Sequence, residues 1–110
     1  MCDEVRTARI AALNDDFRKA PGKAWVVTAG VFQFGPEFVA RAVGLVGKFE
    51  AFGEDNDPLG EHDFGALELD GQRLYWKIDY YARDLGEGSP DPADVAATRR
   101  VMTLMLAEEY

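Results

Sequence analysis

The spacing of apolar residues predicts helices and a short strand in the first half of the chain. Residues 3–20 carry apolar side chains at helical spacing and end at a Pro-Gly pair, so they are predicted to form a helix. Residues 24–29 are apolar and rich in β-formers, which is typical of a buried strand. A second helix is predicted to begin at Pro36, since proline is favoured at the first helical position, and to end near Gly47.

Two alternating segments, residues 63–69 and 73–81, predict a β-hairpin. They are separated by Asp70-Gly71, a residue pair that favours a type I′ turn, so Leu69 should face Gln72. This register gathers apolar residues on one face, which we expect to pack against helices. The apolar face comprises Leu67, Leu69, Leu74, Trp76, Ile78 and Tyr80.

The opposite face of the predicted hairpin carries the candidate chemistry. If the register continues beyond the strand, the only histidine, His62, faces Asp79. A histidine held by a carboxylate is an arrangement used for general acid–base catalysis, and His62 and Asp79 are therefore the candidate catalytic residues. A stabilising cross-strand contact is the alternative reading of the same pair.

The remaining segments complete the expected fold. Residues 49–52 are predicted to form a short strand, and residues 92–109 a final helix that follows the loop beginning at Ser89. The chain is thus expected to form one α+β domain over residues 1–110, in the order α-β-α-β-β-β-α. Its antiparallel sheet of three or four strands should carry the helices on one face.

The charge of the chain excludes some partners and permits others. Twelve basic and twenty acidic residues give a formal net charge of −8, which disfavours direct binding to nucleic acid or to an anionic membrane. A basic protein surface, a second copy of the chain or a cation remains compatible, and so does a role in solubility alone. The single cysteine, Cys2, permits no internal disulfide, and the sequence shows no signal peptide or membrane-length apolar run, so a cytoplasmic location is expected.

One acidic stretch of the sequence contains all the candidate metal ligands. Between Lys48 and Arg73 the chain has eight carboxylates and no basic residue except its histidine. An EF-hand beginning at Asp55 would need a glutamate at its twelfth position, where Ala66 stands, so that motif is excluded. A looser metal site would use ligands suited to a hard or borderline cation, and a solvated loop is the alternative. The candidate metal ligands are Asp55, Asp57, Glu61, His62 and Asp63.

The expected binding surface joins this acidic stretch to the polar and aromatic face of the hairpin. No cofactor is indicated by any motif in the chain. We expect the surface to contact a basic protein or a second copy of the chain. Its predicted residues are Glu54, Asp55, Asp57, Glu61, Asp63, Phe64, Tyr75, Lys77 and Tyr81.

Several stretches together resemble a known family. They are Leu13-Asn-Asp-Asp-Phe-Arg18, the acidic segment 55–65 with Trp76-Lys-Ile-Asp-Tyr-Tyr81, and Ser89-Pro-Asp-Pro-Ala-Asp94 leading into residues 98–110. The chain resembles the bacterial family called domain of unknown function 3768, often found on plasmids and other mobile elements. The resemblance implies a small stand-alone cytoplasmic protein. It supplies no activity and no catalytic residues.

These observations favour a non-enzymatic protein-binding module, with an accessory or anti-defence role suggested by analogy with acidic proteins of mobile elements that imitate nucleic acid. The alternative is a small metal-binding protein or enzyme that uses His62, Asp79 and the acidic loop Asp55–Asp63. A structural homodimer without a ligand is the third possibility.

Overall fold

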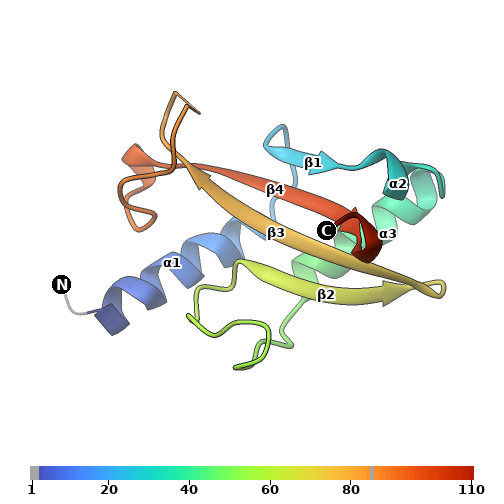
Figure 1. Cartoon of the computed structure of the whole chain (residues 1–110), viewed down its shortest axis with the longest axis horizontal. Helices are drawn as coiled ribbons and strands as arrows, with labels where there is room; N and C mark the ends of the chain where they lie inside the picture. The colour runs from blue at the N-terminus through green and yellow to red at the C-terminus, as the bar shows by residue number, and fades with distance from the viewer. Residues whose placement is uncertain (1–2, 85) are drawn as a thin grey trace.

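The four strands of the chain form one sheet, and α-helices lie behind it (Figure 1). The computed structural model describes residues 3–84 and 86–110, so the expectation for Cys2 lies outside the described residues. No helix within these ranges is long and apolar enough to span a bilayer. The elements are α1 (Asp3–Arg18), β1 (Trp25–Val27), α2 (Ala29–Phe32), α3 (Pro36–Lys48), β2 (Phe64–Leu69), β3 (Gln72–Tyr81), the 3₁₀ helix η1 (Val95–Ala97), β4 (Arg99–Leu106) and the 3₁₀ helix η2 (Ala107–Glu109).

The predicted hairpin is confirmed in its turn and in its register. Asp70 and Gly71 have φ of 51° and 79°, the left-handed values that a type I′ turn requires at both central positions. Leu69 pairs with Gln72, and the ladder continues as predicted to Phe64 opposite Lys77. The apolar face of the hairpin therefore packs under the helices, as the alternation of its residues indicated.

The predicted final helix is wrong. Within residues 92–109, Arg99–Leu106 form β4, which lies between β1 and β3 in the strand order β1-β4-β3-β2, and only two short 3₁₀ helices flank it. Short apolar runs cannot be assigned from periodicity alone, and this run is rich in Met and Leu, which are good helix formers. Pairing with β1 on one side and β3 on the other provides partners for the backbone N–H and C=O groups of β4. The side chains of Met102, Leu104 and Leu106 are buried in the core below the sheet.

Two further expectations need correction, although the α+β class is confirmed. The sheet is mixed, because β1 pairs parallel with β4 while the other strands are antiparallel. Residues 49–52 do not form a strand. Phe49 and Phe52 instead pack their rings edge-on against Trp76, with centroid distances of 5.5 and 6.1 Å. Their contribution to the fold is therefore made by side chains rather than by backbone pairing.

Trp76 occupies the centre of the core and requires a glycine opposite it. Its side chain is fully buried, and its cross-strand partner is Gly65. A Cβ atom at Gly65 would lie 2.4 Å from the indole Nε1 and 2.6 Å from Cε2. The backbone of β2 therefore approaches the indole ring more closely than any side chain on Gly65 would permit.

We predict that Gly65→Ala destabilises the fold by about 1–3 kcal/mol, because the indole ring must shift within a filled core. Urea unfolding measures this difference. Gly44→Ala is the matched control, since its Cβ would meet no atom within 4 Å and should stabilise α3 by up to ~1 kcal/mol. Equal stability of the Gly65→Ala variant and the wild type would contradict the close packing at Trp76.

Candidate functional site

The acidic loop, expected over Asp55–Asp63, is part of an ordered segment between α3 and β2, and from here the name covers residues 50–63. Its tip is closed by hydrogen bonds from the Asp57 amide to the Gly53 carbonyl oxygen and from the Gly53 amide to Asn56 Oδ1, both 2.8 Å. The side-chain amide of Asn56 also donates to the carbonyl oxygen of Ala51 at 2.9 Å. These contacts give the loop a defined conformation before it meets any partner.

His62, whose side chain is 29% exposed, is held between other residues of the acidic loop and α1. Its imidazole stacks on the ring of Phe52, with centroids 3.9 Å apart and planes 1° from parallel. Nδ1 lies 3.0 Å from Asp15 Oδ1, and Nε2 lies 3.7 Å from Asp57 Oδ2. Asp57 is itself buried and accepts a hydrogen bond from the His62 amide at 3.1 Å. The ring therefore lies between two carboxylates that both help to fix the loop.

The expected pairing of His62 with Asp79 is wrong. The ladder continues only to Asp63, whose carbonyl oxygen accepts from the Ile78 amide at 2.8 Å. His62 has a φ of 57°, so the chain leaves the strand path and its side chain turns toward α1. Asp79 instead forms an ion pair with Lys77 at 3.0 Å. The two candidate catalytic residues are thus not brought together.

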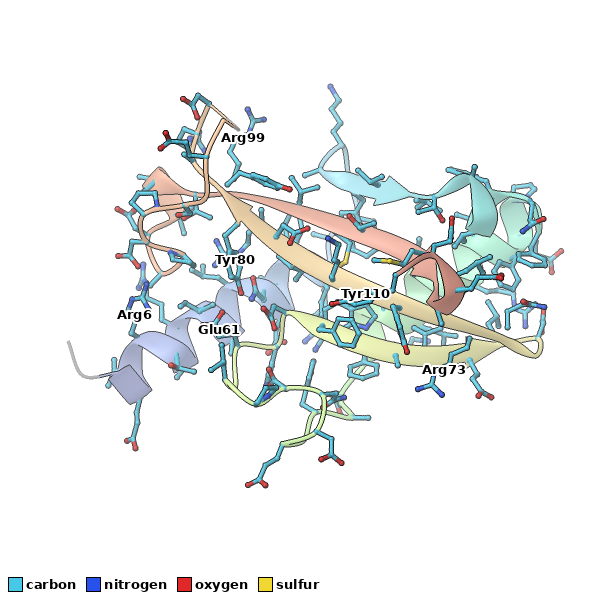
Figure 2. All side chains as sticks on the ribbon, viewed as in Figure 1. Arg6, Glu61, Arg73, Tyr80, Arg99 and Tyr110 are labelled. Carbon is cyan, nitrogen blue, oxygen red and sulfur yellow. The ribbon has the colours of Figure 1, made fainter. Side chains whose placement is uncertain are left out.

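A buried amide connects the acidic loop to the sheet. Asn14 of α1 is fully buried, and its Nδ2 donates to the Glu61 carbonyl oxygen at 2.9 Å and to Tyr80 Oη at 2.8 Å. Its Oδ1 accepts from Arg100 Nε at 2.7 Å. The Tyr80 hydroxyl donates to Glu61 Oε1 at 2.9 Å, and burial raises the pKa of Tyr80. Figure 2 shows Glu61 and Tyr80 close together beside α1.

A second buried residue of α1, Arg18, closes the end of α3. Its Nη1 donates to the carbonyl oxygens of Val46 and Gly47 at 2.8 and 3.2 Å. These are acceptors that the helix leaves unsatisfied at its C-terminal end. The guanidinium also pairs with Asp15 at 3.0 Å and lies over the Phe52 ring. Sequence reasoning missed Asn14 and Arg18 as contact residues, because polar side chains on an otherwise amphipathic helix are expected to face water.

The acidic loop therefore contains carboxylates of two kinds. Asp57 and Glu61 hold internal hydrogen bonds, whereas Glu54 and Asp55 are exposed and have no hydrogen bond or ion pair within the described chain. Leu59 lies in the same loop with 71% of its surface exposed. Within residues 3–84 and 86–110, no group of three or more acidic, histidine or cysteine side chains is arranged to hold a metal ion.

The open face of the sheet brings part of the predicted binding surface together. Phe64, Tyr75 and Tyr110 form an aromatic cluster with centroid distances between 5.2 and 5.7 Å. Tyr110 was missed because the final segment was expected to be helical. Lys77 borders this cluster, while Tyr81 lies at the far end of β3, opposite Arg99. Figure 2 shows Tyr110 over the strands near Arg73 and distant from Arg99.

Asp63 connects the acidic loop to this open face. It lines a shallow hollow of about 310 Å³ with Phe64, Lys77 and Tyr110. Partial burial, followed by the charge of Glu61, raises the pKa of Asp63 above its usual range. The ionised form of Asp63 therefore lowers the stability of the folded state. A carboxylate with a raised pKa is one that its position in the fold does not stabilise in the charged form.

Comparison with known protein families matches most of the chain to one family. The model of a family described as "Protein of unknown function (DUF3768)" matches residues 27–109. No curated protein and no solved structure matches the chain. The match covers the acidic loop and strands β2, β3 and β4, whereas α1 precedes it.

We predict that Asn14→Leu destabilises the fold by about 3 kcal/mol, because it leaves the Arg100 Nε–H and the Glu61 carbonyl oxygen buried without their partner. Urea unfolding gives the stability, and hydrogen exchange should accelerate at residues 61–63. Asp16→Leu introduces the same side chain at an exposed position of α1 and should change stability by no more than ~0.5 kcal/mol. Similar stabilities for the two variants would show that the Asn14 contacts contribute little.

We predict that Asp63→Asn raises the melting temperature at pH 7. Because the folded-state pKa of Asp63 is raised, its protonated form favours the fold, and that stability is lost as the pH rises through the folded pKa. The advantage of the amide should disappear below the unfolded-state pKa of about 3.9, where both states of the wild type are protonated. A melting-temperature difference that is constant from pH 3 to pH 7 would contradict this assignment.

Proposed function

This chain belongs to the DUF3768 family of proteins of unknown function, and we propose that it is a non-enzymatic module that binds a basic protein through its acidic loop. The observation that carries the proposal is the ordered tip of that loop. Two exposed carboxylates, Glu54 and Asp55, lie in the same loop as the exposed side chain of Leu59, and the backbone of the loop tip is fixed by its own hydrogen bonds.

The order of the loop favours recognition over a purely solvating role. A surface that must be ordered on binding loses conformational entropy, and a preformed loop avoids much of that cost. Asn56 and Asp57 hold the tip from within, so their side chains serve the loop conformation rather than the contact. Glu54, Asp55 and Leu59 are all exposed on this loop, which thus offers charge for steering and an apolar side chain for burial.

The overall charge supports a basic protein as the partner. A net charge of −8 opposes approach to a phosphate backbone and attracts a positively charged surface over roughly a Debye length, about 10 Å at 0.1 M salt. The same charge is compatible with an accessory or anti-defence role in which the loop occupies a nucleic-acid-binding surface of a host protein. That extension rests on analogy and not on the fold.

The proposal does not use His62. Its two ring nitrogens face Asp15 and Asp57, and one face of its ring is covered by Phe52. A general base must reach the proton of a bound substrate, and this ring is directed at groups of its own protein. The geometry therefore supports a structural role for His62 in fixing the acidic loop.

We predict that replacing Glu54 and Asp55 together by Gln and Asn weakens capture of basic partners without altering the thermal melt, since neither side chain has a hydrogen bond or ion pair among the described residues. The measurement is capture from a native host lysate, with mass spectrometry of the bound proteins, followed by association kinetics with the principal captured protein. Its association rate constant should fall steeply between 50 and 300 mM NaCl, concentrations chosen to span a Debye length of roughly 6–14 Å.

The matched control neutralises two exposed carboxylates elsewhere, with Glu4→Gln and Glu87→Gln in one chain. This variant has the same net charge as the loop variant, so it separates local recognition from a general charge effect. Equal loss of binding in both variants would overturn the loop as the contact. An association rate that does not depend on salt would overturn electrostatic recognition.

A further inference from the structure

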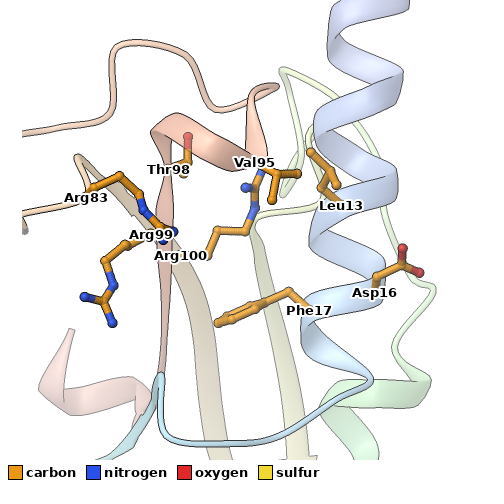
Figure 3. A pocket seen from close by; sticks show the side chains of 8 residues that line it. All are labelled: Leu13, Asp16, Phe17, Arg83, Val95, Thr98, Arg99 and Arg100. Atoms are coloured by element: carbon orange, nitrogen blue, oxygen red, sulfur yellow. The ribbon is translucent and has the colours of Figure 1, made fainter.

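A cavity that is wide open to solvent and separate from the acidic loop lies between α1 and the beginning of β4. Its volume is about 380 Å³, within the range of roughly 300–1,000 Å³ seen for small-molecule sites. Figure 3 shows Leu13, Asp16 and Phe17 on the helix side of the opening and Arg83 and Arg99 on the side of the sheet. The residues that line it are Leu13, Asp16, Phe17, Arg83, Val95, Thr98, Arg99 and Arg100.

Two arginines in this cavity differ from all the others in the chain. The other six each have a partner: five donate hydrogen bonds within the protein, and Arg73 lies over the Tyr75 ring. Arg83 and Arg99 have no hydrogen bond, ion pair or aromatic partner among the described residues. Both are exposed, and both line this one cavity. In a chain with twenty carboxylates, two neighbouring guanidinium groups without an acidic partner mark a local anion site.

The rest of the lining is mostly apolar and gives the cavity two chemically different sides. Leu13, Phe17 and Val95 supply apolar surface, and Val95 is 54% exposed although it is aliphatic. Arg100 contributes its stem, since its guanidinium is already used by Asn14 and by the Pro92 carbonyl oxygen. Asp16 is the one carboxylate in the lining and lies on the helix side, so an anion is directed away from it toward the two arginines.

We propose that this cavity binds a small organic anion in which a carboxylate or phosphate is attached to an apolar body. The anionic oxygens contact Arg83 and Arg99, whose planar guanidinium groups match the geometry of either anion. The apolar body rests against Leu13, Phe17 and Val95 and covers apolar surface that water now contacts. The site lies outside the acidic loop, so it is independent of the proposed partner contact.

The test uses NMR titration of the whole chain with phenyl phosphate and with benzoate, followed at the arginine Nε–H groups and the amides of residues 95–100. The relative affinities of these two probes distinguish phosphate from carboxylate. Inorganic phosphate lacks the apolar body and phenol lacks the charge, so each should bind at least about tenfold more weakly than phenyl phosphate. Inorganic phosphate binding as tightly as phenyl phosphate would overturn the proposed two-sided site.

Variants locate the site. The double variant Arg83→Gln/Arg99→Gln should weaken phenyl phosphate binding by at least about tenfold, whereas Arg73→Gln, at the opposite end of β3 from Arg83, should leave the affinity unchanged. Asp16→Asn should tighten binding, because it removes the only carboxylate of the lining, and improved binding cannot result from unfolding. No response to either organic anion, or equal effects of the Arg73 and Arg83/Arg99 variants, would overturn the proposal.

Discussion

The buried amide of Asn14 is the contact on which the arrangement of this protein depends. It joins four parts of the chain: α1, the acidic loop through Glu61, β3 through Tyr80 and β4 through Arg100. A buried polar group stabilises a fold only when its hydrogen-bonding capacity is satisfied, and here both amide hydrogens and the carbonyl oxygen are used. The position of α1 on the sheet is consequently fixed by directional bonds as well as by apolar packing.

This contact also determines which acidic residues face the solvent. Glu61 and His62 hold the base of the loop against α1, and Asp57 is hydrogen-bonded to His62, whereas Glu54 and Asp55 remain exposed in the turn of residues 53–57. An acidic composition by itself allows any of the eight carboxylates between Lys48 and Arg73 to be functional. The network divides them into those that hold the loop and those that remain available to a partner.

Helix α1 separates two regions of opposite charge. The acidic loop packs against the side of α1 that carries Asp15, and the arginine-lined cavity opens on the side that carries Asp16 and Phe17. The family match begins after α1, yet Asn14 and Arg18 supply contacts to matched segments on strands β3 and β4, on the acidic loop and on α3. The matched segments therefore need this helix, or an equivalent element, to supply a hydrogen-bond acceptor for Arg100 Nε and donors for the last carbonyl groups of α3.

The sequence alone determined the parts of the structure that depend on neighbouring residues. Asp70-Gly71 specifies its turn because both residues tolerate positive φ, and the two-residue turn then defines the hairpin register as far as Phe64. Proline at the start of α3 and the periodic burial of its apolar residues likewise act within a few residues. Local conformational preference is sufficient at these positions, and the predictions made from it were correct.

Only the tertiary structure decided the features that depend on distant partners. Residues 99–106 become a strand because β1 and β3 offer hydrogen bonds on both sides, a condition that periodicity does not reveal. His62 leaves the hairpin register because Asp15, 47 residues earlier, holds its ring. Arg83 and Arg99 become a pair only when the loop after β3 meets the start of β4. Local sequence limits the conformations of each segment, but long-range hydrogen bonding and burial select among them, and the candidate sites of this protein arise at those long-range contacts.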